Sequence, residues 1–383
     1  MTSALPIPAT LDAVPAAVES ALAAFFDDAV PAAARIDARV GAAAEVLREF
    51  VLQGGKRVRP SFAYAGWLAG SSSADRTVAT DDTDAPDAAD ALRVAASLEL
   101  VQACALVHDD IIDRSDTRRG RATVHRIFEH RHRDDGWAGD PGHHGTAAAI
   151  LVGDLALAWA DDMVHGHRPG SDSAHTPPPR PLPAPVGGVW ASMRTEVLGG
   201  QYLDIVNEAS GDESIESAYR VMQFKTAAYT VARPLELGAT LAGAPAGLVD
   251  DLRSVGHDLG IAFQLRDDLL GVFGDPERTG KPSGDDLVAG KRTALVAEGL
   301  ARAAEHDDAS AQRLRESIGR PLSDDELRTA REILTQVGAV GEIEQQISAL
   351  LDSALTTLRR ADLTEPVRDE LTAFARRIAH RTT

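Results

Sequence analysis

The sequence VQACALVHDDIID, residues 101–113, is an apolar helical stretch that ends in three aspartates. Asp109 and Asp113 are four residues apart, so on a helix their carboxylates lie on one face, a turn from each other. Asp110 points about 100° away, because a helix has 3.6 residues per turn. A buried helix that delivers carboxylates into a core needs a partner for them. We therefore expect a cation between these aspartates, since it would remove the repulsion of like charges.

A second apolar helical stretch ends in the same way. It reads FQLRDDLLG, residues 263–271, with Gln264 one turn before Asp267 and Asp268. Two such clusters on separate helices could face each other across a bundle core. That arrangement suits Mg²⁺, which takes few protein carboxylates and completes its shell with water and substrate phosphate. The acidic pairs at 161–162, 307–308 and 324–325 are interpreted as solvated surface.

The rest of the chain reads as helix almost throughout, which predicts an all-α fold. We prefer a single domain, with its core at about residues 30–380, because the motifs lie on both sides of every break in the pattern. The breaks are predicted loop insertions at about 70–90, 131–145 and 166–188. The predicted helices cover residues 10–26, 30–53, 91–113, 146–164, 189–208, 214–243, 247–272, 292–304, 323–335 and 339–360.

Composition narrows the class of protein. The chain has 39 Lys and Arg against 58 Asp and Glu, a formal charge of −19, so it is a poor candidate for nucleic-acid binding. Cys104 is the only cysteine, which excludes an intramolecular disulfide and fits a reducing cytoplasm. No signal peptide is indicated, and no uninterrupted run of about 18 apolar residues predicts a transmembrane segment.

Basic residues are placed to bind the anions that magnesium would carry. The stretch GGKRVRP, residues 54–60, puts three cations within four residues after a flexible Gly-Gly turn. Arg118-Arg119-Gly120 follows the first acidic cluster by five residues. Lys225-Thr226 lies in a predicted helix, and Lys281 and Lys291 flank the loop after the second cluster. Carboxylate sites interleaved with cationic sites are what two diphosphates would require.

In these motifs the chain resembles the trans-isoprenyl diphosphate synthases, also called polyprenyl synthetases. The resemblance runs in one consistent order from about residue 30 to the C-terminus. It rests on Gly54–Pro60, Asp109–Asp113, Arg118-Arg119-Gly120, Gly153-Asp154, Gly200-Gln201 through Asp204, Lys225-Thr226, Phe263–Asp268, Gly280-Lys281-Pro282 through Asp286, and Gly290-Lys291-Arg292-Thr293.

The resemblance implies antiparallel helices around a deep central cavity, the isoprenoid synthase type I fold, usually in a homodimer. It implies an enzyme that condenses isopentenyl diphosphate with dimethylallyl, geranyl or farnesyl diphosphate to a trans-polyprenyl diphosphate. The implied catalytic residues are Asp109, Asp110, Asp113, Lys225, Asp267 and Asp268. Two or three Mg²⁺ ions would be bound through Asp109, Asp113 and Asp267.

The implied substrate-binding residues fall into two groups. Arg118, Lys225, Thr226, Gln264, Lys281 and Lys291 would hold the allylic diphosphate. Lys56, Arg59 and Arg119 would hold isopentenyl diphosphate, with Arg57 and Gln102 counted among the substrate-binding residues.

Two positions depart from the family pattern. Gln102 stands one turn after Glu99, where the family often has a histidine; glutamine still donates a hydrogen bond but cannot become cationic. Gly271 stands where a third aspartate of the second cluster is frequent. Neither change is expected to abolish activity.

Product length is predicted from the helix below Asp109. Cys104 and Ala105, one turn earlier, are small, and Val101 on the next turn is of middling size. Because a turn rises about 5.4 Å, roughly one prenyl unit, we expect a C20 product, geranylgeranyl diphosphate, with C15 or C25 and longer as neighbours. Replacing Cys104 with phenylalanine is expected to shorten it.

Three other readings stay open. A terpene cyclase would use aspartates and Mg²⁺ but would not need the second diphosphate site at 54–59. A non-catalytic synthase subunit should have lost ligands that this chain keeps. In a helical scaffold, the acidic pairs would all lie on the solvated surface and no active site would be needed. The histidines in the predicted loops lack the spacing with carboxylates or thiolates that a zinc site would show.

Overall fold

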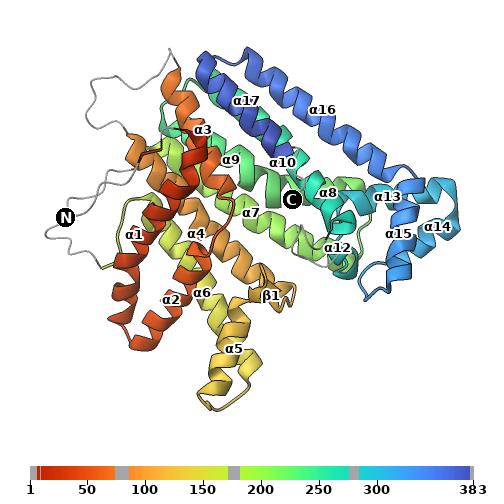
Figure 1. Ribbon diagram of the computed structural model, residues 1–383, viewed down its shortest axis with the longest axis horizontal. Helices are drawn as coiled ribbons and strands as arrows, with labels where there is room; N and C mark the ends of the chain where they lie inside the picture. Colours follow the sequence, from red (N-terminus) through yellow and green to blue (C-terminus); the bar gives the residue numbers. More distant parts are fainter. Residues whose placement is uncertain (1–6, 9, 74–85, 171–181, 276–283, 380–383) are drawn as a thin grey trace. The chain divides into compact units, whose positions relative to one another are not determined.

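The computed structural model describes residues 7–8, 10–73, 86–170, 182–275 and 284–379. Nearly all of them are helical, which confirms the expected all-α class. Within the described ranges the chain forms two compact units. The first is formed by the described residues of Met1–Ser71, Asp75–Gly188 and Leu237–Ala244, and the second by those of Ser72–Ala74, Val189–Glu236 and Pro245–Thr383. Figure 1 shows the helices of both units.

The first unit is built around helix α4. Its elements are η1 (Leu11–Ala13), α1 (Val14–Ala34), α2 (Ala38–Leu52), α3 (Val58–Ser72), α4 (Ala88–Ile112), β1 (Thr117–Arg118), β2 (Arg121–Ala122), α5 (Val124–Asp134) and α6 (Pro141–Val164). Helix α4 packs against α1, α2, α5 and α6. Among the described helices it alone has the length and composition to cross a membrane, yet 72% of its apolar window is buried inside the protein. That burial is what a core helix shows.

The second unit contains most of the remaining helices. They are α7 (Ala184–Ser210), α8 (Ile215–Val221), η2 (Met222–Ala232), α9 (Arg233–Leu241), α10 (Ala246–Phe273), α12 (Asp285–Val288), α13 (Ala294–His306), α14 (Asp308–Glu316), α15 (Asp324–Gln336), α16 (Ala339–Arg360) and α17 (Glu365–Ala379). Helices α7 and α9 carry the chain from one unit into the other. Helix α10 packs against η2 and α16, and η2 is π-helical, a form that often marks functional sites.

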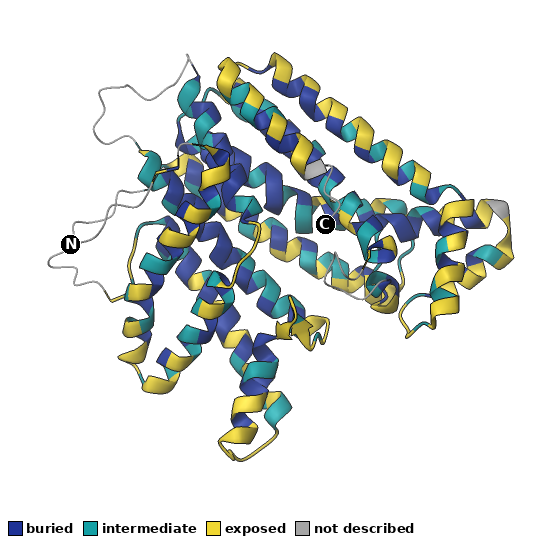
Figure 2. Ribbon diagram, viewed as in Figure 1, coloured by how far each residue is buried: buried dark blue, intermediate teal, exposed yellow. Residues whose placement is uncertain are grey.

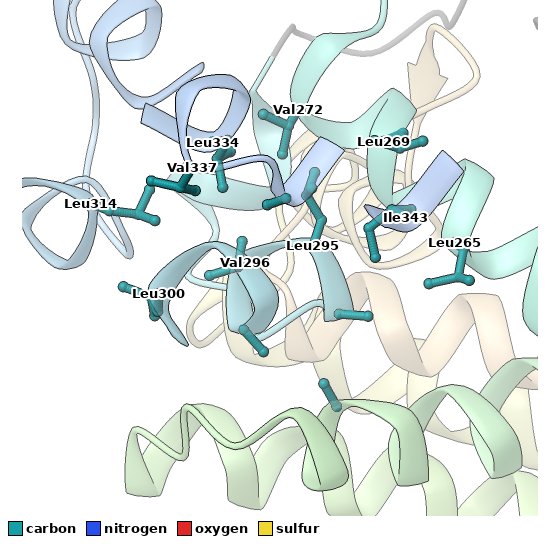
Figure 3. Close-up of a cluster of buried hydrophobic side chains, with 14 of the residues drawn as sticks. Leu265, Leu269, Val272, Leu295, Val296, Leu300, Leu314, Leu334, Val337 and Ile343 are labelled. Atoms are coloured by element: carbon teal, nitrogen blue, oxygen red, sulfur yellow. The ribbon is translucent and has the colours of Figure 1, made fainter. Parts of the chain in front are cut away.

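Apolar packing holds the acidic end of α10 in place. Leu265, Leu269 and Val272 of α10 join residues of α13, α15 and α16 in one buried cluster, shown in Figure 3. Helix α16 turns Ile343 and Ile347 into this cluster and exposes its opposite face, as Figure 2 shows. Each such side chain contributes about 1.5–3 kcal/mol when it is fully buried. The end of α10 is therefore a firm base for Asp267 and Asp268.

Side-chain caps begin helices α4 and α13. The Asp87 carboxylate accepts hydrogen bonds from the backbone N–H groups of Ala89 and Asp90, and the Asp90 side chain accepts one from the Asp87 N–H, which completes a capping box at α4. The Thr293 hydroxyl accepts from the Val296 N–H at the start of α13. Such caps are worth about 1 kcal/mol each.

Several element boundaries differ from those predicted. Helix α1 continues to Ala34 through Pro31, and the chain breaks at 35–37 rather than at 27–29. Helices α3, α5, α14 and α17 were not predicted. The loop expected at 131–145 shrinks to 135–140, because Asp140 caps α6 and a proline occupies its first position. Much of the other two expected loops, residues 74–85 and 171–181, lies outside the described residues.

Candidate active site

The first acidic cluster closes helix α4. Asp113 is the C-cap residue, and its backbone N–H donates to the Asp109 carbonyl at 2.8 Å, so the two residues lie one turn apart as predicted. The Asp109 side chain is 18% exposed, and Asp113 is exposed. Arg118 Nη2 lies 3.5 Å from Asp109 Oδ2. An arginine thus stands beside the carboxylates that were expected to bind metal.

Asp110 points into the protein instead. It is 1% exposed, and its Oδ1 accepts a hydrogen bond from Arg118 Nε at 2.8 Å and lies 2.7 Å from Arg118 Nη2 in an ion pair. Burial raises the pKa of Asp110, and the neighbouring guanidinium only partly opposes this. In this geometry Asp110 fixes Arg118, and a direct catalytic contact of Asp110 has no support.

The Gly-Gly-Lys-Arg loop separates its three cations. Lys56 is exposed and Arg59 is half-buried, whereas Arg57 is buried and paired with Glu99. Arg119, from the β1–β2 hairpin, donates from Nη1 to the Gly54 carbonyl at 2.6 Å. The structure therefore brings together the hairpin and the loop, which were expected to share one diphosphate. The Arg57 side chain thus lies against Glu99 in the interior, apart from the more exposed Lys56 and Arg59.

One stripe of α4 runs down from the acidic cluster. Gln102, Ala105, Asp109 and Asp113 recur every three or four residues and are each at least partly exposed. Cys104 is buried, and its Sγ lies 3.7 Å from His108 Nδ1.

Packing explains why Cys104 faces the protein interior. The ring of His108 fills the space over Gly153 of α6, where a Cβ would lie 2.2 Å from His108 Nε2. Burial, together with the charge of Asp154, raises the pKa of the Cys104 thiol to about 12. Val101 is also buried, at 3% exposure. Of the three residues expected to set product length, Ala105 is the one that shares the stripe of Asp109.

In the second unit, Lys225 lies on η2 and pairs with Asp204 of α7. Its Nζ is 2.5 Å from Asp204 Oδ2, and the two side chains are 25% and 27% exposed. Helix α7 approaches closely because residue 200 is glycine: a Cβ there would lie 2.3 Å from the Lys225 nitrogen. The sequence did not predict that Asp204, the last residue of the Gly200–Asp204 motif, pairs with this lysine. Thr226 is half-buried beside it.

The second acidic cluster divides like the first. Asp267 is exposed, whereas Asp268 is 2% exposed and accepts hydrogen bonds from Gln264 Nε2 at 2.7 Å and from the Ala294 N–H at 3.1 Å. Burial raises the pKa of Asp268 to about 7; the Gln264 bond opposes the rise and the charge of Asp286 adds to it. Asp268 therefore holds Gln264 rather than facing outward with Asp267.

Gly271 leaves room for a carboxylate from another helix. A Cβ at residue 271 would lie 1.8 Å from Asp286 Oδ2. Asp286, on α12, thus occupies the space where the family often carries a third aspartate, and its carbonyl accepts from the Lys291 N–H at 3.0 Å. Lys291 is half-buried at the start of the turn into α13. Lys281 lies outside the described residues.

The outward carboxylates fit magnesium bound together with a diphosphate. No described group of three or more His, Cys, Asp or Glu side chains forms a metal site by itself. In the first unit Asp109 and Asp113 offer hard oxygen ligands, and in the second unit Asp267 offers one. Mg²⁺ commonly binds one or two carboxylates while phosphate and water complete its shell, so each cluster taken by itself matches an ion that arrives with substrate.

Comparison with known proteins settles the family. The polyprenyl synthetase family model matches residues 41–334, more than half of the chain. The chain belongs to the polyprenyl synthetase family. Membership makes it a trans-prenyltransferase of isoprenoid biosynthesis and confirms the resemblance seen in its motifs.

Three relatives show what this polyprenyl synthetase is similar to. One is the crystal structure of a geranylgeranyl pyrophosphate synthase from Corynebacterium glutamicum, complexed with isoprenyl diphosphate and magnesium. That protein is 47% identical to this chain, and the match covers 97% of this chain and 99% of that one with a TM-score of 0.85. A geranylfarnesyl diphosphate synthase of Aeropyrum pernix is 31% identical over 83% of this chain and 87% of the relative. A (2E,6E)-farnesyl diphosphate synthase of Mycobacterium tuberculosis is 34% identical over 63% of this chain and 59% of its own length.

These similarities establish the isoprenoid synthase fold for this polyprenyl synthetase. The three relatives carry names for three different product lengths, so family membership does not fix the length made here.

Proposed function

We propose that this enzyme condenses isopentenyl diphosphate with dimethylallyl, geranyl or farnesyl diphosphate and makes mainly geranylgeranyl diphosphate. The observation that carries the proposal is the composition of the first unit. The Asp109 carboxylate, one turn from Asp113, lies beside Arg118, and Arg119 donates to the Gly54 carbonyl of the loop that carries Lys56 and Arg59. Two anion-binding groups, one with metal ligands, are what a condensation of two diphosphates needs.

Each diphosphate has its own set of ligands in this proposal. Lys56, Arg59, Arg119 and Gln102 hold isopentenyl diphosphate. Arg118, Lys225, Thr226, Gln264, Lys281 and Lys291 hold the allylic diphosphate, with two or three Mg²⁺ ions bound to Asp109, Asp113 and Asp267. The family match spans residues of both units, so we propose that the chain is a single polyprenyl synthetase domain.

The reaction proceeds by ionisation, condensation and elimination. Bound Mg²⁺ supplies charge neutralisation for the departing diphosphate. Arginine and lysine donors hold the same oxygens as the allylic C–O bond breaks and its electron pair leaves with the diphosphate. The double bond of isopentenyl diphosphate then forms the new C–C bond with the allylic carbon. The proton lost afterwards passes to the released diphosphate, and apolar helix walls exclude water from the cation.

The proposed product length follows from the stripe on α4. The growing chain runs from Asp109 past Ala105, whose small side chain leaves space, along the earlier turns of α4. Alternatives of C15, or of C25 and longer, remain within the same chemistry, as the names of the relatives illustrate.

Homodimer formation in the cytoplasm completes the proposal. Helix α7 exposes large apolar side chains: Leu198 is 53% exposed and Tyr202 is 67% exposed. They lie four residues apart on one helix face, and a contiguous apolar face of this kind typically marks a protein interface.

One assay tests the function. Purified protein is incubated with Mg²⁺, labelled isopentenyl diphosphate and each allylic primer in turn, and the products are separated by chain length. We expect C20 product that disappears when EDTA removes the metal. Cyclised hydrocarbon without consumption of isopentenyl diphosphate would contradict the proposal, and so would no product with any primer.

A further inference from the structure

The loop that carries Lys56 is held in an unusual backbone conformation. Gly54 and Gly55 have φ of 92° and 147°, which glycine adopts freely, but Arg57 has φ of 45°. A non-glycine residue in this left-handed region is strained, and it persists only where its surroundings hold it there. We therefore expect contacts of the Arg57 side chain to hold the backbone in this conformation.

The Arg57 guanidinium is fixed on both sides inside the protein. Its Nη1 donates to Glu99 Oε2 of α4 at 2.5 Å, and its Nη2 donates to the Val51 carbonyl of α2 at 2.7 Å. The side chains of Arg57 and Glu99 are 4% and 9% exposed. The Arg57 carbonyl also accepts from the N–H and hydroxyl of Ser61 in α3. One residue thus joins the ends of α2 and α3 to the middle of α4.

The residues proposed to hold isopentenyl diphosphate surround this junction. Lys56 and Arg59 flank Arg57 in the sequence, and Gln102 lies one turn beyond Glu99 on α4. Arg119 fixes the same loop from the other side through the Gly54 carbonyl. Any shift of Arg57 would move Lys56 and Arg59 relative to Gln102.

We propose that the buried Arg57–Glu99 ion pair is a positioning device for the isopentenyl diphosphate site, an inference that rests on the proposed function. The pair touches no substrate. It holds the strained loop so that Lys56 and Arg59 meet the diphosphate already oriented, and binding then costs less ordering of the loop. The allylic diphosphate relies on other residues, so the pair should affect one substrate and not the other.

The test measures KM for each substrate separately. Glu99→Gln leaves the shape almost unchanged but removes the charge opposite Arg57. We expect its KM for isopentenyl diphosphate to rise roughly tenfold, while kcat and KM for geranyl diphosphate stay within about twofold. Arg57→Lys keeps the charge but makes fewer directed hydrogen bonds, so an intermediate rise is expected. It also serves if Glu99→Gln does not fold.

A matched control separates positioning from stability. Glu236 is also buried, at 6% exposure, and pairs with Arg233 and Arg253. Glu236→Gln should lower Tm without changing either KM. If Glu99→Gln behaves like this control, or raises both KM values equally, the inference is overturned.

Binding distinguishes failure of the inference from failure of the proposed function. Isothermal titration with isopentenyl diphosphate is run on the wild type and on Glu99→Gln. If the wild type binds isopentenyl diphosphate but forms no product, weaker binding by Glu99→Gln still supports the positioning role and equal binding rejects it. If the wild type does not bind isopentenyl diphosphate, both proposals are overturned.

Discussion

The two Asp-Asp pairs look alike in the sequence, but their buried carboxylates have different hydrogen-bond partners. In each pair the second aspartate is buried, Asp110 at 1% and Asp268 at 2% exposure. Asp110 meets a guanidinium, whereas Asp268 meets a side-chain amide and a backbone N–H. Burial raises the pKa of both carboxyls. For Asp268, whose hydrogen-bond partners among the described residues are the uncharged Gln264 side chain and the Ala294 N–H, the pKa reaches about 7.

The two buried aspartates have one kind of contact in common: each accepts a hydrogen bond from a residue proposed to bind the allylic diphosphate. Asp110 hydrogen-bonds Arg118, and Asp268 hydrogen-bonds Gln264. Arg118 and Gln264 are both proposed ligands of the allylic diphosphate. In each cluster, then, we propose that the first aspartate binds metal and that the second orients a substrate ligand.

The largest expected effect comes from removing the first aspartate of either pair. Asp109→Ala and Asp267→Ala should each lower kcat by roughly 10³-fold or more at saturating Mg²⁺, because the charge of the leaving diphosphate is no longer neutralised. Tm should change little, since neither side chain is fully buried. Asp324→Ala, at an exposed Asp-Asp pair on α15, is the control and should keep wild-type turnover. Near-normal turnover of Asp109→Ala would contradict the metal role.

The next largest effect is the difference in unfolding free energy lost when the buried aspartate of each pair is replaced. Asp110→Asn leaves Arg118 without its closest counter-charge and should cost about 3 kcal/mol of unfolding free energy, with a higher KM for the allylic substrate. Asp268→Asn should cost about 1 kcal/mol, because Gln264 can reverse its amide to accept from the new side chain. Urea unfolding of both variants measures the difference. Equal losses would show that the partner of the buried carboxyl does not matter.

Product length tests the face of α4 below the first pair. Ala105→Phe places a ring on the stripe of Asp109 and should shorten the main product by at least one prenyl unit. Cys104→Phe places its ring toward His108, so we expect a weaker shortening and a loss of about 1–3 kcal/mol from overpacking. Chromatography of the products from both variants decides. A stronger effect at Cys104 would place the cavity on the other side of α4.

The smallest effect concerns Cys104 on the buried side of α4. Because burial raises the pKa of the Cys104 thiol to about 12, almost no reactive thiolate exists at pH 8. Iodoacetamide should therefore label the folded protein far more slowly than the urea-unfolded protein, as mass spectrometry can follow. Equal labelling rates would show that this face is open to solvent.

Sequence periodicity was sufficient wherever a helix alone decides the geometry. The four-residue spacing of Asp109 and Asp113 predicted their common face, and the 100° step per residue predicted that Asp110 would diverge. The apolar approach to each cluster predicted the two helix ends. These features are local, so no knowledge of the packing was needed.

Other features depend on contacts distant in the sequence and could not be predicted. Lys56, Arg57 and Arg59 look equivalent until the left-handed backbone at Arg57 turns one of them inward. The absent aspartate at 271 suggested a lost ligand, but a carboxylate 15 residues later fills its space. Asp204 could have been found from its place in the Gly200–Asp204 motif, once that motif was read as a partner for Lys225.

Ligand binding tests most directly whether the first aspartate of a pair binds metal while the second orients a substrate ligand. Geranyl thiolodiphosphate, an analogue that ionises poorly, is titrated calorimetrically into wild type, Asp109→Asn and Asp110→Asn with and without Mg²⁺. We expect the wild type to bind tightly only with Mg²⁺, Asp109→Asn to lose the metal-dependent gain, and Asp110→Asn to keep that gain at lower affinity. Metal-dependent binding that survives in Asp109→Asn and vanishes in Asp110→Asn would contradict the account.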